Sequence, residues 1–277
     1  MPKKYFEYFP TTEYTIDNFK NIKVKDVFRR VIVKMNKFEN LDFQITRDQR
    51  PEMVADQLYD DPFYHWVLLL SNNIVDPINE WYMDDKFFNN YISSKYPNHN
   101  LRLNTNHFDS DKSRFFIEGE KIYQQGSSNT KTGTVINFDP DLLQITFKYD
   151  TGSQPFTKGS VVKATTTDEG GSNKDGAIIQ VEKEINAIKY YSYLKQTSKT
   201  VNSEVRKTTE SFIINQRTAS MFSGSDASSY TEIDNYTYEV LENTRKSKIF
   251  YIPPSDIPVF ENDFKQVLAG VKNGWYL

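Results

Sequence analysis

The sequence contains no cysteine, only three histidines, and no apolar run that approaches the length of a transmembrane helix. Without cysteine, disulfide bridges, thiolate zinc sites and thiol nucleophiles are excluded, and the composition fits assembly in a reducing cytoplasm. His65, His99 and His107 are scattered and lack HxH or HxxxH spacing, so we expect no metal site. The opening residues, MPKKYFEYFP, lack the apolar segment of a signal peptide. We therefore expect a chain that is neither secreted by a signal peptide nor inserted into a membrane.

An excess of basic residues is also lacking. The sequence has 34 Lys and Arg residues against 37 Asp and Glu residues, which gives a net charge of −3 at pH 7. Proteins that bind nucleic acid usually carry a basic stripe that neutralises phosphates. The charge balance therefore disfavours nucleic acid as a partner.

Motifs that would indicate catalysis or a cofactor are missing as well. The neighbouring acids Asp60-Asp61 and Asp84-Asp85 are typical of solvated or helix-capping positions rather than of a glycosidase pair. The cluster GGSNKDG at 170–176 lacks the GK[ST] ending of a phosphate-binding loop and predicts a hairpin or a mobile loop. We expect no enzymatic activity and no cofactor.

Aromatic residues, in contrast, are abundant. The 277 residues include 20 Phe, 18 Tyr and 3 Trp, which together make up 15% of the sequence. Aromatic residues are favoured in strands and as anchors of protein interfaces. A chain of this length can form one large domain or a few small ones, each with its own core.

The region 41–73 has the clearest pattern. LDFQITRD alternates apolar and polar residues and predicts a strand. Pro51 suits the first position of a helix, with Asp48 nearby as a cap. Four residues are expected on the buried side of this helix: Met53, Val54, Gln57 and Leu58. The break DDP at 60–62 precedes a second, buried helix over 63–70, which ends at the polar trio SNN.

Two tryptophans need a role. Trp66 lies within the continuous apolar run of the second helix, and we assign it to the core. Trp81 follows the break at Pro77, and its sequence context fits a core residue and an interface residue equally well.

The flanking regions have weaker patterns. KVKDVFRRVIVKM predicts a short amphipathic helix from five apolar residues at helical spacing, although 31–33 could equally form a strand: Val24, Val27, Phe28, Val31 and Ile32. From Phe115, short runs rich in β-branched and aromatic residues predict a small antiparallel barrel or sandwich. Residues 196–235 are rich in Ser, Thr and Asn, and NYTYEVLENTRKSKIFYIPP predicts strands before a terminal helix.

These patterns divide the chain into six segments. We expect an N-terminal interaction segment (1–40), a strand–helix–helix module (41–95), a linker (96–113), an inserted all-β domain (114–190), an extended arm (191–235) and a C-terminal strand–helix segment (236–277).

The module resembles the LysM family. In PEMVADQLYDDPFYHWVLLLSNNIVDP, the turn YDDP, the helical Trp66 and the segment NIVDP occupy the positions of that family's Tyr-Gly-Asp/Asn-Pro turn, Trp and Asn-x-Ile/Leu-x-Pro segment. The preceding ITRDQRPEMVA lacks the Gly-Asp-Thr typical of glycan-binding members. The resemblance implies a LysM-like βαα module. With the inserted small antiparallel β-barrel or sandwich and the C-terminal strand–helix segment that the residue patterns predict, the expected fold class is α+β.

A second resemblance covers more of the chain. Four blocks in the same order are similar to the baseplate wedge protein of T-even-type contractile-tailed bacteriophages, the wedge subunit with a LysM-like region: YFEYFPTTEY, VKDVFRRV, RPEMVADQLYDDPFYHWVLLLSNNIVDPINEWYM and YEVLENTRKSKIFYIPPSDIPVFENDFKQVL. The similarity spans residues 1–95 and 236–270 and leaves the predicted β domain without a counterpart.

This resemblance implies a structural role. Such subunits join neighbouring wedge proteins around the central hub during tail assembly, have no known catalytic role, and lie in the virion after assembly in the cytoplasm of the bacterial host. The implied partners are other wedge subunits and neighbouring wedges, with several copies per baseplate. The expected partner-binding residues are Tyr5, Phe6, Tyr8, Phe9, Tyr59, Asn72, Asn73, Asp76, Trp81 and Tyr82. The alternative is a peptidoglycan-binding protein that recognises an N-acetylglucosamine polymer through the LysM-like module.

Overall fold

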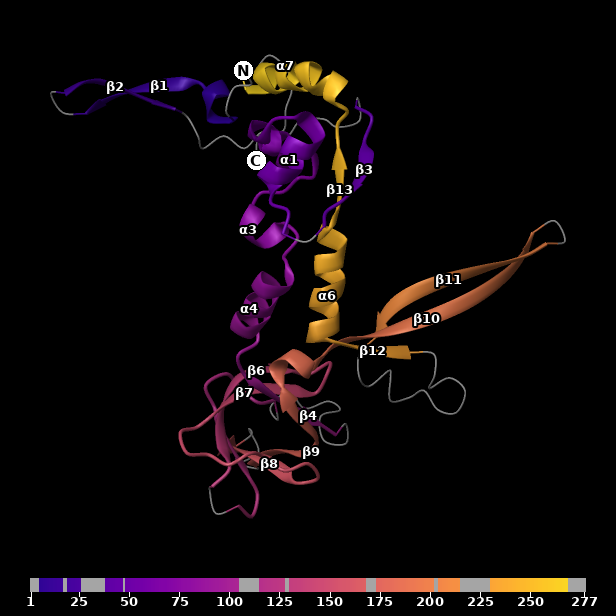
Figure 1. Ribbon diagram of the computed structural model, residues 1–277. Helices are drawn as coiled ribbons and strands as arrows, with labels where there is room; N and C mark the ends of the chain where they lie inside the picture. The colour runs from indigo at the N-terminus through magenta and orange to yellow at the C-terminus, as the bar shows by residue number, and fades with distance from the viewer. Residues whose placement is uncertain are drawn as a thin grey trace. The chain divides into compact units, whose positions relative to one another are not determined.

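The computed structural model describes residues 5–16, 19–25, 38–46, 48–104, 115–127, 130–167, 173–201, 204–214 and 230–268. The chain forms two compact units (Figure 1). The first unit comprises Met1–Phe87 and Glu242–Leu277, and the second comprises Phe88–Leu241. Two distant parts of the chain therefore build the first unit, and the second unit is inserted between them.

The first unit contains the strand and the two helices that the sequence predicts. They are β3 (Leu41–Gln44), α1 (Pro51–Tyr59), the 3-10 helix η3 (Pro62–Tyr64) and α2 (His65–Ser71). A second strand, β13 (Lys248–Tyr251), pairs antiparallel with β3 and places Ile249 opposite Phe43. Figure 1 shows the two strands side by side. The C-terminal segment thus completes a two-stranded sheet beside the two helices.

The acidic break between α1 and α2 has a local physical cause. Asp60 has a φ of 56°, in the left-handed region, and its N–H donates to the Asp56 carbonyl at 2.9 Å. This geometry ends a helix because it turns the chain away from the helix axis. The Asp61 carboxylate then accepts from the Phe63 N–H at 2.8 Å and caps η3.

Two expectations for α1 are wrong. The cap position is held by Arg50, whose side chain makes no capping hydrogen bond, so Asp48 does not cap this helix. Met53 and Gln57 are exposed, whereas Val54 and Ala55 are buried. The two strands decide the buried side, because their side chains pack against α1 from a direction that the spacing of the helix alone does not reveal.

Two hydrophobic clusters form the core of the first unit. In one, the Trp66 ring lies 5.9 Å from the Phe260 ring and 5.0 Å from the Phe264 ring, centroid to centroid. Both phenylalanines belong to α7 (Ile257–Leu268). The other cluster packs α1 against the sheet and includes Trp81 and Ile249. The assignment of Trp66 to the core is confirmed, and each cluster requires residues from both parts of the chain.

The N-terminal region contains a 3-10 helix, η1 (Tyr5–Tyr8), and a β-hairpin of β1 (Thr11–Ile16) and β2 (Phe19–Lys25). Val24, expected to open an amphipathic helix, lies in β2 instead. The remaining residues of that expected helix fall within 26–37, outside the described residues.

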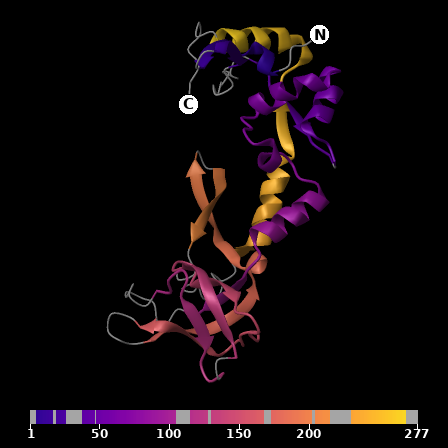
Figure 2. The same cartoon turned by 90° about the vertical axis from the view of Figure 1, so that its left-hand side faces the viewer.

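The second unit contains a closed antiparallel barrel with the strand order β4-β7-β6-β5-β8-β9, so of the expected barrel or sandwich the structure shows the barrel (Figure 2). The strands are β4 (His99–Leu103), β5 (Lys121–Gln124), β6 (Thr132–Asp139), β7 (Gln144–Tyr149), β8 (Val161–Thr167) and β9 (Asn173–Lys183). Completely buried side chains fill its interior, among them Leu101, Ile122, Ile145 and Phe147. The barrel is therefore a packed core and not a channel.

The barrel begins earlier than the sequence indicates. β4 lies within the segment expected to be a linker, yet it pairs with both β7 and β9 and closes the barrel. Residues 173–176 of the glycine cluster lie in β9, which pairs antiparallel with the preceding strand β8 and agrees with the hairpin alternative; residues 170–172 lie outside the described residues. At Gly176 a Cβ atom would lie 2.8 Å from Leu103 Cδ1, so glycine lets β9 pass close to β4.

Most of the expected arm consists of strands. β10 (Ile188–Val201) lies between β11 (Glu204–Ile214) and β12 (Tyr230–Asp234) in a three-stranded antiparallel sheet, and a 3-10 helix, η6 (Glu184–Asn186), precedes it. Residues 215–229, which include the most polar part of the expected arm, lie outside the described residues.

The strands expected after residue 235 are mostly wrong, because α6 (Asn235–Lys246) is a helix and only β13 is extended. Alternating Tyr236, Tyr238 and Val240 imitate a strand. The helix is instead held by polar residues four positions apart, Asn235 and Glu239, which are buried. The remaining helices within the described ranges are α3 (Pro77–Glu80), α4 (Asp85–Lys95) and the 3-10 helix η8 (Pro254–Asp256) before α7.

Candidate interaction surface

The tightest polar geometry among the predicted site residues lies between α2 and α4, in a segment that we call the α3 corner (residues 73–80). The Glu80 carboxylate accepts from the N–H groups of Val75 and Asp76 at 2.6 and 3.1 Å. The Asp76 carboxylate in turn accepts from the Ile78 N–H at 3.0 Å. The two carboxylates thus hold backbone N–H groups at the start of α3 in a reciprocal way that resembles a capping box, with Glu80 one position later than in that motif.

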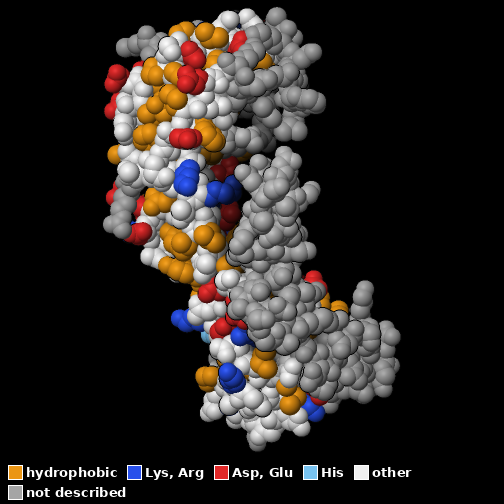
Figure 3. Space-filling model, turned by 90° about the vertical axis from the view of Figure 1, so that its right-hand side faces the viewer, with side chains coloured by type: hydrophobic (Ala, Val, Ile, Leu, Met, Phe, Trp, Pro, Cys, Tyr) orange, Lys and Arg blue, Asp and Glu red, His pale blue; other side chains and the backbone are white. Residues whose placement is uncertain are grey.

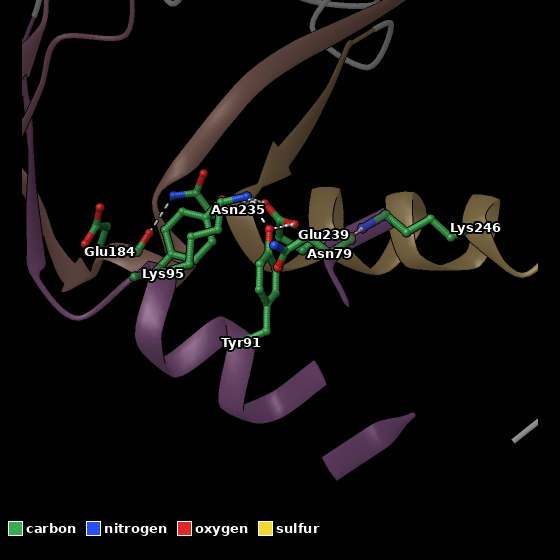
Figure 4. Close-up of polar contacts among 8 residues, drawn as sticks. Asn79, Tyr91, Lys95, Glu184, Asn235, Glu239 and Lys246 are labelled. Carbon is green, nitrogen blue, oxygen red and sulfur yellow. Dashed lines mark hydrogen bonds and ion pairs between the residues drawn. The ribbon is translucent and has the colours of Figure 1, made fainter. Parts of the chain in front are cut away.

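Further contacts fix the α3 corner. Asp76 also accepts from the Asn79 side-chain amide at 2.6 Å, and this hydrogen bond holds the pKa of the Asp76 carboxyl below its ordinary value. The Lys246 ammonium donates to the Asn79 carbonyl at 2.7 Å and joins the corner to the end of α6 (Figure 4). The carboxylates of Asp76 and Glu80 are thus hydrogen-bonded to backbone N–H groups of the corner itself.

This arrangement presents two apolar side chains to solvent. Val75 is 57% exposed and Ile78 is 83% exposed. A single exposed apolar residue is common on a protein surface. Two of them on a short segment whose backbone is fixed by hydrogen bonds form a preorganised apolar contact point, which loses little conformational freedom on binding.

Asn72 lies at the C-terminal end of α2 and contacts β13. Its Nδ2 donates to the Phe250 carbonyl at 2.7 Å, and its Oδ1 accepts from the Phe250 N–H at 2.8 Å. The same Nδ2 donates to the Leu68 carbonyl at 2.8 Å. The Phe250 side chain is 50% exposed. Asn72 therefore positions an exposed aromatic residue.

The predicted aromatic residues at the N-terminus divide into exposed and buried ones. Phe6 is 55% exposed, whereas Phe9 is buried in the cluster around Trp66. Tyr8 is half-buried, its hydroxyl donates to Glu261 at 2.9 Å, and its ring lies 5.6 Å from that of Trp66. Tyr5 lies in η1. Phe9 is thus a core residue, and Phe6 is the most accessible of the described side chains here.

The other predicted aromatic residues pack in or beside the core. Trp81 is buried, and its indole N–H donates to the Gln49 carbonyl at 2.9 Å, so the structure favours the core alternative for this residue. Tyr82 is partly buried against the same cluster. Tyr59 is also half-buried, and burial raises the pKa of its hydroxyl.

The structure therefore brings together Asn72, Asn73 and Asp76 in one segment, while the aromatic predictions gather mainly around the two core clusters. The sequence reasoning missed Val75 and Ile78. Their exposure could have been predicted from the sequence. Both residues flank Asp76-Pro77, a pair typical of a helix start, and a loop has no core of its own to bury them. Whether the ten residues bind partners stays a prediction.

A polar cluster within the second unit holds α6 against α4 (Figure 4). The buried Glu239 accepts from the Lys95 ammonium at 2.8 Å and from the Tyr96 hydroxyl at 2.6 Å through Oε1. Its Oε2 accepts from the Tyr91 hydroxyl at 3.3 Å. We call these four residues the Glu239 cluster. A carboxylate in this position is compensated by three donors, so it can stay charged although it is buried.

The pKa values of the Glu239 cluster agree with this interpretation. Burial by itself raises the pKa of Glu239, but the hydrogen bonds from Lys95 and Tyr96 outweigh it and hold the pKa below its ordinary value. Burial lowers the pKa of Lys95, and its hydrogen bonds to Glu239 and Tyr91 more than reverse that effect. Burial and the hydrogen bond to Glu239 raise the pKa of Tyr96.

The acidic residues that could suggest catalysis have structural roles. Asp61 caps η3, and Asp84 accepts from the N–H groups of Lys86 and Phe87 at 2.9 Å. His65 Nδ1 lies 3.0 Å from the Pro62 carbonyl. Across the part of the chain that the structure describes, no group of three or more His, Cys, Asp or Glu residues could hold a metal ion.

Figure 3 shows hydrophobic side chains in patches on one face of the first unit, with acidic side chains beside them. None of the helices within the described ranges is long and apolar enough to cross a membrane. The face of the first unit seen in Figure 3 thus combines apolar side chains with acidic ones.

The amino-acid sequence was compared with models of known protein families. Residues 3–119 match the family model described as base plate wedge protein 53. The matched segment includes the α3 corner and ends before β5, so five of the six barrel strands lie beyond it. A search of curated proteins found no match.

The match confirms the resemblance to a phage baseplate wedge protein over residues 3–119. It supports a structural role in the baseplate and, with it, a place in the tail of the virion. Because the family is a structural one, the match also favours a protein without enzymatic activity.

Proposed function

We propose that the protein is a non-catalytic subunit of a phage baseplate wedge that joins neighbouring wedge proteins around the central hub during tail assembly. The family match over residues 3–119 supports the class of protein. In this proposal the subunit is assembled in the bacterial host cytoplasm, occurs in several copies per baseplate, and contacts other wedge subunits and neighbouring wedges.

The observation that carries the joining role is the geometry of the α3 corner. Ile78 is 83% exposed on a turn whose backbone N–H groups are held by Asp76 and Glu80. Burying one such side chain in a partner contributes about 1.5–3 kcal/mol. On a fixed turn, most of this free energy contributes to binding, because little conformational entropy is lost. On a mobile loop, the entropy cost of ordering the loop would offset part of the free energy of burial.

We further propose that the first unit contains a LysM-like module. The order β3, α1, α2 and the antiparallel return of β13 support it. The second strand comes from beyond the inserted unit, so the module is interrupted in sequence. In this proposal the module contacts protein partners through the α3 corner. In the alternative, the module would bind a glycan instead of a protein.

Co-expression with the other wedge subunits of the same phage tests the proposal. Ile78→Asp should weaken capture of a wedge subunit by roughly 30-fold, because a carboxylate would replace a buried anchor. The matched control is Val259→Asp on α7, which is also exposed and apolar but lies outside the matched residues. Both variants should retain the unfolding midpoint of the parent protein. Unchanged capture by Ile78→Asp, or equal loss in both variants, would contradict the proposal.

A further inference from the structure

The β3–β13 sheet has one edge that carries free peptide groups. Residues of an antiparallel strand alternately direct their N–H and C=O groups toward the partner and away from it. The Ile45 N–H donates to the Ser247 carbonyl at 2.8 Å, and the register pairs Phe43 with Ile249. Asp42 and Gln44 therefore direct their peptide groups away from β13. Among the described residues, no hydrogen bond reaches the backbone of Asp42.

The opposite edge of the same sheet is closed. There the outward N–H and C=O groups of Phe250 are both occupied by the Asn72 side chain, at 2.8 and 2.7 Å. A further strand cannot pair with β13 at this position without displacing Asn72. The sheet thus offers a single edge for strand addition, along β3.

The side chains along β3 specify what can pair there. Asp42 and Gln44 are exposed, Glu39 is exposed just before the strand, and Leu41 and Phe43 are half-buried. A strand added to this edge would align apolar residues with Leu41 and Phe43, and a basic residue with Asp42. Pairing of β3 with β3 of another copy is disfavoured because it brings these acidic residues close together.

The chain itself contains a strand of the required chemistry. β2 reads FKNIKVK, so Lys23 and Lys25 alternate with Ile22 and Val24. Both lysines are exposed, and β2 belongs to a two-stranded sheet, which leaves its outer edge without a strand partner among the described residues. Lys23 pairs with Glu13 at 3.3 Å in an exposed ion pair. Such a pair contributes little and can be exchanged for another.

We propose that β2 of one copy adds to β3 of a second copy, with Lys23 opposite the acidic side chain of Asp42. The two strands differ, so each copy offers one donor strand and one acceptor edge. A contact of this kind is heterologous, and it joins copies head to tail into a ring or an open chain. It deepens the proposed function, on which its place between neighbouring wedges rests.

Cysteine cross-linking of the purified full chain tests the contact, because the natural sequence has no cysteine to interfere. Lys23→Cys and Asp42→Cys are mixed at high concentration under mild oxidation and should form a disulfide-linked dimer. The matched control replaces Asp42→Cys by Asp56→Cys, an exposed position on α1 of the same unit. Equal dimer in both mixtures would overturn the proposal. So would an intramolecular disulfide in the double variant Lys23→Cys, Asp42→Cys, which should instead give linked multimers.

Charge exchange provides a second test without cysteine. Asp42→Lys should weaken self-association in sedimentation velocity by about fivefold, because it opposes like charges. Adding Lys23→Glu to the same chain should restore it. A monomeric parent protein at all concentrations, or a double variant that does not recover, would overturn the proposal. These experiments contain no other wedge subunit, so a negative result would not contradict the proposed role of the α3 corner. In the same way, a negative result with Ile78→Asp would not contradict the β2–β3 contact.

Discussion

The side-chain amide of Asn72 forms the two hydrogen bonds to the backbone of Phe250 that a neighbouring strand would otherwise form, although 178 positions separate the two residues. A third hydrogen bond to the Leu68 carbonyl orients the same amide. The end of α2 is thereby fixed to β13. Asparagine suits this position because its carboxamide has the donor and the acceptor of a peptide group.

Replacing Asn72 by alanine should destabilise the first unit by about 1–3 kcal/mol, because the Phe250 N–H and C=O lose their partners. Asn72→Asp should also be destabilising, since a carboxylate can accept from the Phe250 N–H but repels its carbonyl. Urea unfolding measures both. Asn40→Ala, at an exposed position just before β3 in the same unit, serves as the control. A midpoint that does not move in Asn72→Ala would show that water replaces the amide without cost.

Trp66→Ala should destabilise the first unit by about 3–5 kcal/mol, the usual cost of truncating a buried large aromatic residue. The ring is buried among Tyr8 of η1 and Phe260 and Phe264 of α7, so its removal leaves a cavity lined by these two elements. Phe6→Ala, at an exposed position nearby, should stay within about 0.5 kcal/mol of the parent. Thermal and urea unfolding provide the measurement, and an unshifted curve for Trp66→Ala would contradict the core assignment.

The barrel should fold as an isolated fragment only when β4 is present. A fragment of residues 97–187 contains all six strands and should give a β-type circular dichroism spectrum with a cooperative transition. A fragment of residues 114–190 lacks β4, which leaves β7 and β9 with open edges and should make it unfolded or aggregated. Cooperative folding of the shorter fragment would show that closure by β4 is dispensable.

The Glu239 cluster should make stability depend on pH. The folded pKa of Glu239 lies below the ordinary value, so its contribution is present above pH of about 4.3 and is lost as pH falls through the lowered folded pKa. The raised pKa of Lys95 gives a contribution that is present below pH of about 10.4 and lost above its folded value. Both effects favour the folded state near neutral pH.

Glu239→Gln should therefore be less stable at neutral pH and should lose less stability on acidification than the parent. Urea unfolding at a series of acidic pH values measures the slope. Glu118→Gln, at an exposed position of the second unit, should leave the slope unchanged. An identical acid slope in Glu239→Gln and the parent would assign the pH dependence to other carboxylates.

Much of the fold could be predicted from the sequence where one periodicity dominates. The strands after residue 115 have alternating apolar residues and clear turn residues, and the barrel follows from them. β4 was missed because Leu101 and Leu103 stand in an Asn-rich stretch that resembles a linker. α6 was missed because its buried side is polar, with Asn235 and Glu239 in the positions where a helix usually carries apolar residues.

The candidate site could be predicted only in part. The predicted segment around Asp76 is the α3 corner, but the geometry gives Asp76 and Asn72 scaffolding contacts and exposes Val75 and Ile78 instead. Tertiary contacts decide this difference, since exposure of an apolar side chain depends on what packs against it. The partner of Phe250 lies far away in the sequence, which no local pattern can show.

The pairing of β3 with β13 also has a consequence for the order of events during synthesis. Ribosomes deliver the chain from its N-terminus at about 5–20 residues per second. β3, α1 and α2 therefore emerge well before β13 and α7, and the entire barrel is made in between. Until the last residues leave the ribosome, Trp66 and Val54 have no α7 or β13 to bury them. A nascent chain would then present this apolar surface for seconds, the interval in which chaperone binding or premature aggregation competes with folding.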